Sequence, residues 1–294
     1  KIKTMKVIIF GNKCKDRIAI YARQLVNSLL KRNVSIYFEK DFCRFLVEKG
    51  IDMAFPHQLL CEGEDFEADM AFSIGGDGTF IKTSAKIGKK NIPIIGINAG
   101  RLGFLADIAG DEIEVAVKEI LDGKYKIEDR TLLRLYTEEK LYKDFNYALN
   151  EIAVMKRDSS SMITIDAWAN DVFINSYQAD GLLISTSTGS TAYSMSVGGP
   201  IVVPQAPNFI ITPIAPHSLN VRPIIIPDDW EIKLRVESRN NQFLIALDGR
   251  NNIFDSKTHL LIKKAGFTTK VVKRENNDFF DTLRSKLMWG MSER

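Results

Sequence analysis

The sequence predicts an α/β + β chain. It comprises an N-terminal α/β domain with a mostly parallel sheet, a C-terminal β-rich sandwich domain, and a C-terminal helix that packs back on the first domain. Strand-like and helix-like segments alternate over residues 1–125, which is typical of a parallel sheet covered by helices. Over residues 126–270, short strand-like runs follow one another with turn residues between them, which favours two packed sheets. Residues 271–294 hold a lone amphipathic helical segment, and such a helix needs a partner surface.

The strands of the α/β domain are expected where short apolar runs interrupt the polar sequence. These runs are residues 6–10, 34–38, 70–74 and 92–97. After the first run, apolar residues recur at steps of three and four from Ile18 to Leu29, which predicts an amphipathic helix. A second helix is expected over residues 111–121, and Gly123 is its candidate C-cap. Because ligands bind at the carboxyl ends of parallel strands, the glycine-bearing turns after the third and fourth runs are the expected site.

The β-rich domain is expected to contain a series of short strands. They are predicted at residues 132–136, 150–155, 162–167, 172–175, 181–185, 224–226, 231–236, 243–247 and 260–262. The chain then becomes helical over residues 278–289, where Phe279, Leu283 and Leu287 mark one face of the helix. We expect this face to pack on the N-terminal domain.

Composition limits the classes of partner. The chain has 294 residues with 40 Lys and Arg against 37 Asp and Glu, a formal net charge of +3. This balance argues against a nucleic-acid partner, although it does not exclude a local basic pocket. No apolar run is long enough to cross a membrane, so no membrane partner is expected. The three cysteines lack zinc-ligand spacing and the three histidines are scattered, which favours free thiols in a cytoplasmic setting and no zinc site.

The stretch SIGGDGTF, residues 73–80, places a carboxylate inside a glycine run. Glycines after a strand usually let backbone N–H groups cradle an anionic phosphate, so the charge of Asp77 needs an explanation. A carboxylate here can accept a proton from a hydroxyl nucleophile or hold Mg²⁺ against phosphates. Thr79 can cap a following helix whose positive end faces the ligand. The motif predicts phosphoryl transfer to an alcohol, and the alternative is a tight turn that merely needs glycine.

A second glycine-bearing turn, NAGRLGF, spans residues 98–104. Its glycines permit close backbone approach to a ligand. Arg101 can contact a phosphate, and Phe104 offers a flat face to a base. The alternative is a loop with an exposed arginine and a phenylalanine that belongs to the core.

The stretch LNEIAV, residues 149–154, places Asn150 and Glu151 side by side at the start of a strand. Adjacent strand residues point to opposite faces, but twist at the mouth of a strand can relax this rule. An amide and a carboxylate together suit a diol such as a ribose. The alternative is a pair of solvated loop residues.

The segment DGLLISTSTGSTAYSMSVGGPIV, residues 180–202, is rich in hydroxyl groups: eight of the twelve residues 185–196 are Ser or Thr. A core strand would not normally hold so many hydroxyls, so we expect a loop that hydrogen-bonds a polar ligand. The alternative is a Ser/Thr-rich surface turn. Tyr193 can stack on a base, and Asp180 can accept from an amide or amine. By contrast, ALDGR, residues 246–250, is expected to be an ordinary hairpin turn.

Together these motifs resemble the NAD kinase family, which phosphorylates the 2′-hydroxyl of the adenosine ribose of NAD. GGDGT alone is shared with diacylglycerol and sphingosine kinases, whereas its combination with NAGRLGF, NE and DGLLISTSTGSTAYSMSVGGP in this order is specific. The resemblance runs from about residue 74 to residue 250. It implies NAD and ATP as small-molecule substrates, Mg²⁺ or another divalent cation, and a homo-oligomer, either a dimer or a tetramer. Whether ATP, another triphosphate or polyphosphate is the donor stays open.

The resemblance also implies roles for individual residues. Asp77 would be the general base on the ribose hydroxyl, and Phe104 would border the adenine. Asn150 and Glu151 would hold ribose hydroxyls or the adenine end, and Asp180 would bind the nicotinamide side. The other expected substrate- or nucleotide-binding residues are Gly76, Gly78, Thr79, Lys82, Ser161, Gln178, Thr188, Thr191, Ala192, Tyr193, Ser194, Met195, Ser196, Ala215 and Arg250. No residue is assigned as a metal ligand.

Three positions depart from the family pattern. Gln178 stands where many bacterial members have a basic residue, and Ser161 stands where some relatives have histidine. Arg250 follows the Asp-Gly pair where glutamine is frequent, and its charge can partly replace the one missing at position 178. How the new 2′-phosphate is held therefore stays open.

Two other functions are compatible with parts of the sequence. A lipid kinase of the diacylglycerol type would share GGDGT and a β-rich second domain, but the Ser/Thr-rich segment argues against it. A non-catalytic sensor of NAD(H) or NADP(H) would not need the acidic residue of GGDGT, and Asp77 is intact. The sequence has no Walker A lysine motif, so the donor phosphates would depend on backbone N–H groups, metal and single basic side chains.

Overall fold

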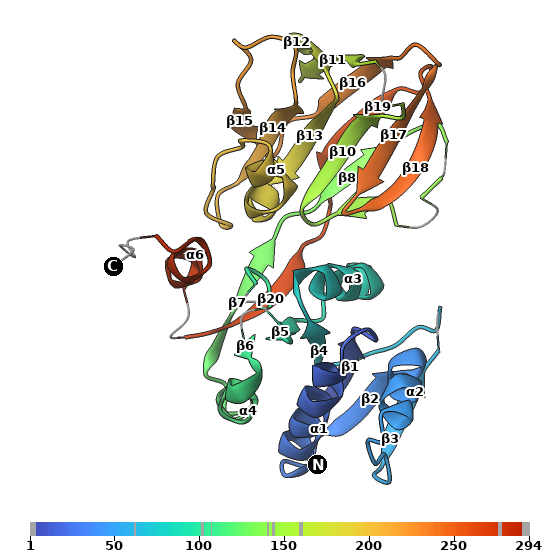
Figure 1. Cartoon of the computed structure of the whole chain (residues 1–294). Coiled ribbons are helices and arrows are strands. Elements are labelled where there is room, and N and C mark those ends of the chain that lie inside the picture. The colour runs from blue at the N-terminus through green and yellow to red at the C-terminus, as the bar shows by residue number, and fades with distance from the viewer. Residues whose placement is uncertain are drawn as a thin grey trace. The chain divides into compact units, whose positions relative to one another are not determined.

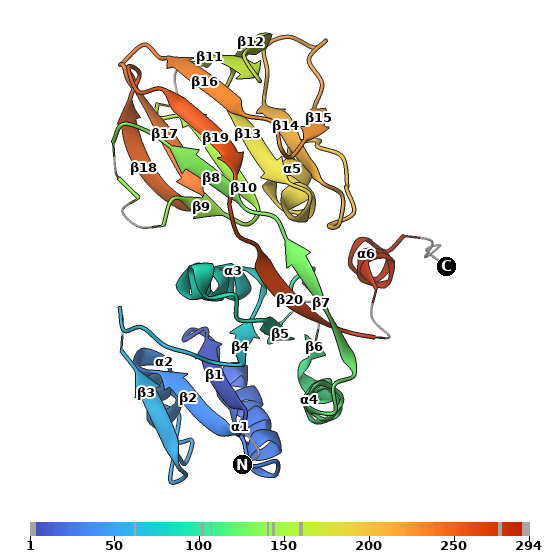
Figure 2. The same cartoon turned by 180° about the vertical axis from the view of Figure 1, so that it is seen from behind.

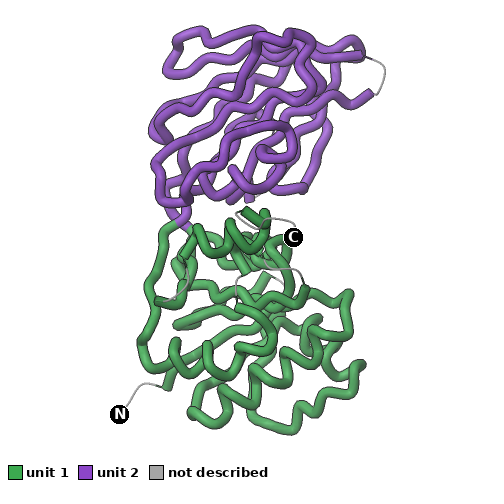
Figure 3. The backbone as a smooth tube through the Cα atoms, turned by 60° about the vertical axis from the view of Figure 1, so that its left-hand side comes forward, with its two compact units in different colours: residues 1–129, 269–294 green, residues 130–268 purple. Residues whose placement is uncertain are grey.

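The computed structural model of the chain divides into two compact units (Figure 3). Unit 1 comprises residues 1–129 and 269–294, and unit 2 comprises residues 130–268. The structure describes residues 4–61, 63–100, 103–106, 108–139, 141–142, 145–158, 161–275 and 278–289.

Unit 1 is built on one sheet with the strand order β3-β2-β1-β4-β5-β20-β7, and β6 pairs with β5 (Figure 1). The strands are β1 (Lys6–Gly11), β2 (Ser35–Glu39), β3 (His57–Leu60), β4 (Met70–Gly75), β5 (Ile94–Asn98), β6 (Ile108–Ala109), β7 (Tyr125–Arg130) and β20 (Thr269–Arg274). The pairs β1–β2, β1–β4, β2–β3, β4–β5, β5–β6 and β5–β20 are parallel. The predicted mostly parallel sheet is therefore confirmed.

Helices supply the apolar partners of this sheet. They are α1 (Asp16–Leu30), α2 (Lys40–Glu48), α3 (Asp77–Ile87), α4 (Ile113–Leu121) and α6 (Phe279–Leu287), with single 3₁₀ turns at Gly88–Lys90 and Gly110–Glu112. Val7 and Ile9 of β1 are fully buried in one apolar cluster with residues of α1, α2 and α4. The predicted periodicity of α1 is confirmed, because Ile18, Leu25 and Leu29 are all buried in that cluster.

Unit 2 is a sandwich of two six-stranded antiparallel sheets (Figure 2). Their orders are β15-β14-β13-β10-β17-β18 and β12-β11-β16-β19-β8-β9. The strands are β8 (Leu133–Tyr136), β9 (Tyr147–Ala148), β10 (Glu151–Lys156), β11 (Ile163–Ala169), β12 (Val172–Ala179), β13 (Gly181–Thr186), β14 (Asn208–Ile214), β15 (Ile224–Pro227), β16 (Ile232–Glu237), β17 (Gln242–Leu247), β18 (Arg250–Asp255) and β19 (Leu260–Lys264). Alternate residues of β11 are buried against the facing sheet, for example Ile165 in one cluster with Val154 of β10, as expected for a sandwich.

Several elements were not predicted from the sequence. They are α2, β3, β6, β7, β9, β14, β18, β20 and the short helix α5 (Tyr193–Ser196). β14 follows a proline-rich stretch and itself contains Pro213, and β18 is largely polar, so neither matches the pattern of an apolar strand. α6 is close to prediction: it ends at Leu287, because Met288 adopts a left-handed conformation with φ 57°. No helix among the described residues is both long and apolar enough to cross a membrane.

Candidate active site

The GGDGT motif forms the turn from β4 into α3. Gly75 ends the strand, Gly76 is the N-cap of the helix, and Asp77 begins it. A Cβ atom on Gly75 would lie 2.2 Å from Thr79 Oγ1, so the turn itself needs this glycine. Added Cβ atoms on Gly76 or Gly78 would meet nothing within 4 Å. These two glycines therefore face open space at the positive end of a helix, as expected where a phosphate approaches.

The carboxylate of Asp77 is held by three successive backbone N–H groups. Phe104 N–H donates to Oδ2 at 2.9 Å, and Leu105 and Ala106 N–H donate to Oδ1 at 3.0 Å each. A Cβ atom on Gly103 would lie only 2.0 Å from Oδ1, so the glycine there makes room for the carboxylate. Asp77 therefore joins the two glycine-bearing turns that follow β4 and β5, and its side chain is fixed in place.

Phe104 lies beside the C-terminal helix. Its ring centroid is 5.9 Å from that of Phe279 in α6, and Lys286 Nζ lies 4.3 Å from the Phe104 ring. Lys286 Nζ is also 3.7 Å from Asp77 Oδ2. Lys286 belongs to none of the sequence motifs, because a local pattern does not indicate where a distant helix will dock. Arg101, the other residue singled out in this turn, lies outside the described residues.

Thr79 and Lys82 lie on a different side of α3 from Asp77. They line a cavity of about 280 Å³ together with residues from the carboxyl ends of β1 and β2. Lys86 of the same helix face pairs with Glu39, and it lines this cavity too. The structure therefore brings two predicted nucleotide-binding residues together at the sheet edge where ligands are expected.

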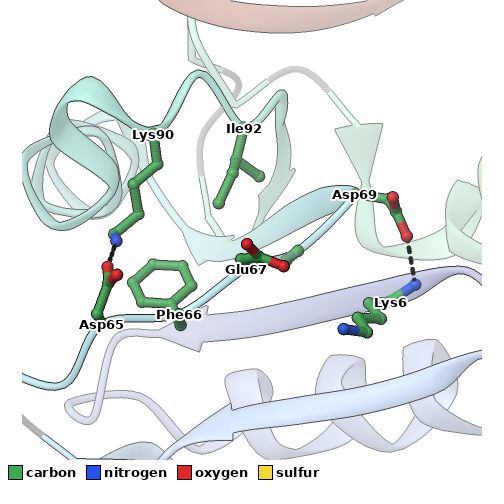
Figure 4. Close-up of a pocket in the computed structure, with 8 residues that line it drawn as sticks. Lys6, Asp65, Phe66, Glu67, Asp69, Lys90 and Ile92 are labelled. Atoms are coloured by element: carbon green, nitrogen blue, oxygen red, sulfur yellow. Dashed lines mark hydrogen bonds and ion pairs between the residues drawn. The ribbon is translucent and has the colours of Figure 1, made fainter.

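A second cavity, of about 450 Å³, lies at the amino ends of the strands (Figure 4). Lys6, at the start of β1, and Asp69, just before β4, line it, and Asp69 accepts from the Lys6 backbone N–H at 2.8 Å. The side chains of Asp65 and Lys90, also in its lining, pair with each other. None of the predicted site residues lines this cavity, and it lies at the edge opposite the glycine turns.

In unit 2, the NE motif is anchored by the hairpin turn of residues 246–250, for which the sequence predicts no role beyond the turn itself. Asp248 and Gly249 have φ values of 47° and 79° between β17 and β18, as a tight hairpin turn requires. The Asp248 carboxylate accepts from the N–H groups of Leu149 at 2.7 Å, Asn150 at 2.8 Å and Glu151 at 3.1 Å. The turn therefore fixes the start of β10. The Asp-Gly pair by itself predicts a hairpin turn and does not indicate that Asp248 bonds residues 149–151.

Three buried side-chain atoms on neighbouring residues have no hydrogen-bond partner among the described residues. They are Asn150 Oδ1, Glu151 Oε2 and Ser185 Oγ, and Glu151 faces Ser185 across β10 and β13. Buried polar atoms are normally hydrogen-bonded, so these three atoms have unused capacity to bond a polar ligand or water. The alternative of solvated loop residues is wrong for Asn150, which is only 8% exposed.

Burial raises the pKa of Glu151 to about 7, and the charge of Asp248 adds to this effect, while the Tyr193 backbone N–H opposes it. Burial also raises the pKa of Asp248, but three N–H donors and the charge of Arg250 oppose it there. Glu151 has fewer hydrogen-bond donors than Asp248, so less opposes the effect of burial on its pKa. A protonated Glu151 can donate a hydrogen bond as well as accept one.

Glu151 should make the stability of the ligand-free protein depend on pH. The folded pKa of about 7 lies above the ordinary value of 4.5, so the stabilising contribution of the protonated form is complete below about pH 4.5 and is lost as pH rises through 7. The difference corresponds to at most about 3 kcal/mol in the free energy of unfolding. Urea denaturation from pH 4.5 to 8 should show this loss for the parent relative to Glu151→Gln. The exposed Glu237→Gln serves as the control, and parallel curves for parent and Glu151→Gln would contradict the expectation.

The Ser/Thr-rich segment is not a simple loop. It continues β13 to Thr186, and then forms a 3₁₀ turn (Thr188–Thr191) and a short helix, α5 (Tyr193–Ser196). Many of its hydroxyls bond within the unit: Thr186 Oγ1 donates to the Leu149 carbonyl at 2.6 Å and Ser187 Oγ to the Ala206 carbonyl at 2.7 Å. The alternative of a surface turn is wrong, because residues 185–188 are buried.

The predicted residues of this segment differ in what they offer a ligand. Ser194 is fully buried and shares a hydrogen bond of 3.1 Å with Thr212, so its hydroxyl serves the fold. Tyr193 is 38% exposed, and its ring is available for stacking. Ser196 is exposed, Thr188 is buried, and Thr191, Ala192 and Met195 are half-buried. A Cβ atom on Gly189 would lie 2.1 Å from the Asn150 carbonyl oxygen, so this glycine lets the segment pack on the NE motif.

The remaining predicted residues of unit 2 are spread over other strands. Asp180 pairs with Lys156 Nζ at 2.6 Å, and Gln178 is exposed on β12. Ala215, after β14, has φ 44°, an uncommon backbone conformation for a residue with a side chain. Ser161 lies half-buried just before β11.

Arg250 begins β18, and its guanidinium is engaged by the backbone of unit 2. It donates to the carbonyl oxygens of Phe145, at 2.9 Å, and Tyr147, and it lies 4.7 Å from the Phe145 ring. Burial lowers the pKa of Arg250, although the charge of Asp248 opposes this. In this structure the guanidinium therefore contributes to the fold around the NE motif. Among the described residues, no group of three or more His, Cys, Asp or Glu side chains could hold a metal ion.

The chain is similar to known proteins over its whole length. The model of the ATP-NAD kinase N-terminal domain matches residues 7–125, and that of the C-terminal domain matches residues 149–273. An NAD kinase of Bacteroides fragilis is 50% identical over 290 residues, covering 99% of this chain and all of the relative. An NAD kinase of Cytophaga hutchinsonii is 45% identical over 287 residues, covering 97% of this chain and 98% of the relative.

Two solved structures share the fold. Yeast NADH kinase complexed with NADH superposes with a TM-score of 0.87 at 24% identity, covering 99% of this chain and 89% of that one. An NAD kinase from Archaeoglobus fulgidus in complex with ATP gives a TM-score of 0.74 at 25% identity, covering 96% and 99%. The alternative of a diacylglycerol-type lipid kinase finds no support in these matches. The chain belongs to the NAD kinase family, and its activity is that of an NAD kinase.

Proposed function

We propose that Asp77 is the general base that accepts the proton of the adenosine 2′-hydroxyl of NAD when ATP supplies the phosphoryl group. The observation that carries this proposal is the position of the carboxylate. Three backbone N–H groups hold it between the two glycine-bearing turns at the carboxyl ends of β4 and β5. Gly76 and Gly78 beside it are open to a ligand.

In this reaction, the ribose 2′ oxygen forms a bond to the γ-phosphorus of ATP. The bond from that phosphorus to the β,γ-bridging oxygen breaks, the electron pair leaves with ADP, and the hydroxyl proton passes to Asp77. A sugar hydroxyl is a poor nucleophile at neutral pH, and a well-placed base typically contributes about 10² to 10⁴ in rate. The rest of the acceleration in phosphoryl transfer comes mostly from alignment and neutralised charge.

We propose that the divalent cation, Mg²⁺ above all, arrives as part of the ATP substrate. Mg²⁺ usually keeps several waters and is held largely by the phosphates of its substrate. Bound to the phosphates, the cation would neutralise part of their charge. The backbone N–H groups around Gly76 and Gly78 would then orient the phosphates.

For NAD itself, we propose the polar cluster of unit 2 as a principal contact. Asn150 Oδ1, Glu151 Oε2 and Ser185 Oγ are buried and lack partners among the described residues, and a ribose or an adenine supplies complementary groups. Tyr193 would offer a ring to a base, because it is exposed next to this cluster. Asp180 and Gln178 would contact the nicotinamide side and the region of the new phosphate, as the family resemblance implies.

One assay tests the function. Incubation with ATP, Mg²⁺ and NAD should yield NADP, whereas diacylglycerol in place of NAD should not be phosphorylated, and mass spectrometry of the products distinguishes the two. A phosphorylated lipid would support the lipid kinase, and binding of dinucleotide without product would support a sensor. Parallel reactions with NADH as acceptor, and with other triphosphates or polyphosphate as donor, define the substrate range.

We also propose a cytoplasmic location and a homo-oligomeric assembly. All three cysteines, Cys14, Cys43 and Cys61, carry free thiols, as is typical of a reducing compartment. The assembly is an implication of the family resemblance. Light scattering coupled to size-exclusion chromatography distinguishes a dimer or tetramer from a monomer.

A further inference from the structure

We propose that Lys286, in the C-terminal helix α6, is a catalytic residue that neutralises charge on the phosphoryl group transferred beside Asp77. The inference rests on the proposed role of Asp77 and extends it to a residue that none of the sequence motifs contains.

The C-terminal helix α6 determines where Lys286 lies. α6 is a regular helix whose N-cap, Asp278, accepts from the Asp281 N–H at 2.8 Å. Leu283 is 3% exposed, and Phe279, one turn before it, contacts the ring of Phe104. Residues spaced by three and four lie on one helical face, so Lys286 follows Phe279 and Leu283 along the face that is already docked.

The ammonium group of Lys286 lies beside both Asp77 and Phe104. Lys286 Nζ lies 3.7 Å from Asp77 Oδ2, which is within the range of an ion pair but beyond that of a direct hydrogen bond. The ammonium also lies 4.3 Å from the centre of the Phe104 ring, which attracts cations. The Lys286 side chain is 34% exposed and that of Asp77 is 28% exposed, so both are partly shielded from water and yet reachable.

The N–H donors of the Lys286 ammonium group remain available to a ligand. An ammonium has three N–H donors, and Lys286 Nζ has no hydrogen-bond acceptor among the described residues. The carboxylate of Asp77, by contrast, already accepts three backbone N–H groups. The ammonium is therefore attracted to the carboxylate without being consumed by it, and its donors are available to a third group.

The proposed reaction supplies that group. When the ribose oxygen attacks, the γ-phosphoryl oxygens come close to Asp77, because the attacking oxygen gives its proton to that carboxylate. Transfer of this proton neutralises Asp77, and the charge of Lys286 is then left to the phosphoryl oxygens. Fixed cations of this kind stabilise the charge of a transferring phosphoryl group. The sequence has no Walker A lysine to do so, and Lys286 reaches the site from the other end of the chain.

A matched set of variants tests this role. Lys286→Met keeps the apolar stem over Phe104 and removes the charge, and Lys286→Arg restores a charge. Arg284→Met removes a positive charge from the same helix, but Arg284 pairs with the exposed Asp281, and no ion pair or hydrogen bond joins it to Asp77 among the described residues. With MgATP and NAD, Lys286→Met should lose on the order of 10- to 100-fold in kcat, while Lys286→Arg stays within about fivefold and Arg284→Met within about twofold of the parent.

Two further readouts separate catalysis from folding. The Kd of NAD without ATP should be the same for parent and Lys286→Met, and thermal melting should show the same transition. If Lys286→Met is unfolded at the assay temperature, Lys286→Gln against Lys286→Arg gives the same comparison at a temperature where both are folded. A kcat within twofold of the parent for the neutral variant, or equal losses for the neutral and the arginine variants, would overturn the proposal.

The same experiment keeps this inference apart from the proposed function. NADP formation by the parent tests the kinase activity, and Asp77→Asn measured in parallel tests the general base. An active Asp77→Asn variant beside a weakened Lys286→Met variant would reject the role of Asp77 in proton transfer, because the cation alone would then matter. A weakened Asp77→Asn beside an unchanged Lys286→Met would reject only the role of Lys286.

Discussion

Asp77→Asn should reduce the turnover of NAD by about two to four orders of magnitude. The substitution removes the carboxylate that we propose as the proton acceptor, and general-base catalysis typically contributes a factor of about 10² to 10⁴. Steady-state kcat with MgATP and NAD measures the effect. Dinucleotide binding without ATP should change far less than kcat, because the ground-state contacts we propose for NAD are mainly those of unit 2.

An asparagine at position 77 would also change the hydrogen bonds that hold the side chain. Oδ1 of an asparagine can still accept from Leu105 and Ala106, but its amide nitrogen would face the Phe104 N–H, which now lies 2.9 Å from Oδ2. Two donors would then oppose each other, and the turn could shift. Asp77→Ala, which introduces no opposing donor, should show an equal or greater loss of kcat.

An exposed carboxylate of the same unit, changed in Asp122→Asn, controls for the loss of one negative charge. Thermal melting of all three variants shows whether the turn contributes to stability as well as to chemistry. If Asp77→Asn and Asp77→Ala both turn over NAD within a few-fold of the parent, Asp77 is not the base.

The part of the site that sequence predicted is the part that a local pattern encodes. Glycines at fixed spacing around Asp77 predict a turn after a strand, and the structure has that turn between β4 and α3. What the pattern does not contain is the set of partners: the N–H donors to Asp77 come from residues 27 to 29 positions away, and Lys286 comes from the last helix. Such contacts depend on how distant elements dock, which no periodicity records.

The fold shows the same division. Elements with a clear apolar period, such as α1 and β11, are where the sequence predicts them. β20 is not predicted, because it joins the sheet of unit 1 only after the chain has passed through unit 2.

The Ser/Thr-rich segment is predicted to hydrogen-bond a polar ligand, but its hydroxyl groups divide between two tasks. Those of Thr186, Ser187 and Ser194 satisfy neighbouring groups of the fold, whereas Ser185 Oγ is left without a partner among the described residues.

Asp248 resembles Asp77 in geometry and differs from it in consequence. Each carboxylate accepts three successive backbone N–H groups, one on Oδ2 and two on Oδ1. Asp77 faces open glycines at a sheet edge, whereas Asp248 lies in a hairpin turn and holds residues 149–151 in place. We therefore expect substitution of Asp248 mainly to lower the stability of the fold. It should also lower the affinity for NAD, because the NE motif would be displaced.

Asp248→Ala should lower the free energy of unfolding by about 3–5 kcal/mol, because it leaves three backbone N–H donors without an acceptor in a buried place, at about 1–3 kcal/mol for each unsatisfied group before relaxation. Alanine is also less tolerant than aspartate of the positive φ of 47° at this position. Asp248→Asn keeps one acceptor oxygen and tolerates the conformation, so its loss should be smaller. Urea denaturation at fixed pH measures both, with the exposed Asp229→Ala as the control. The expected loss is a large part of the stability of a domain, which is about 5–15 kcal/mol. A loss for Asp248→Ala below about 1 kcal/mol would mean that water replaces the carboxylate and that the turn does not anchor the NE motif.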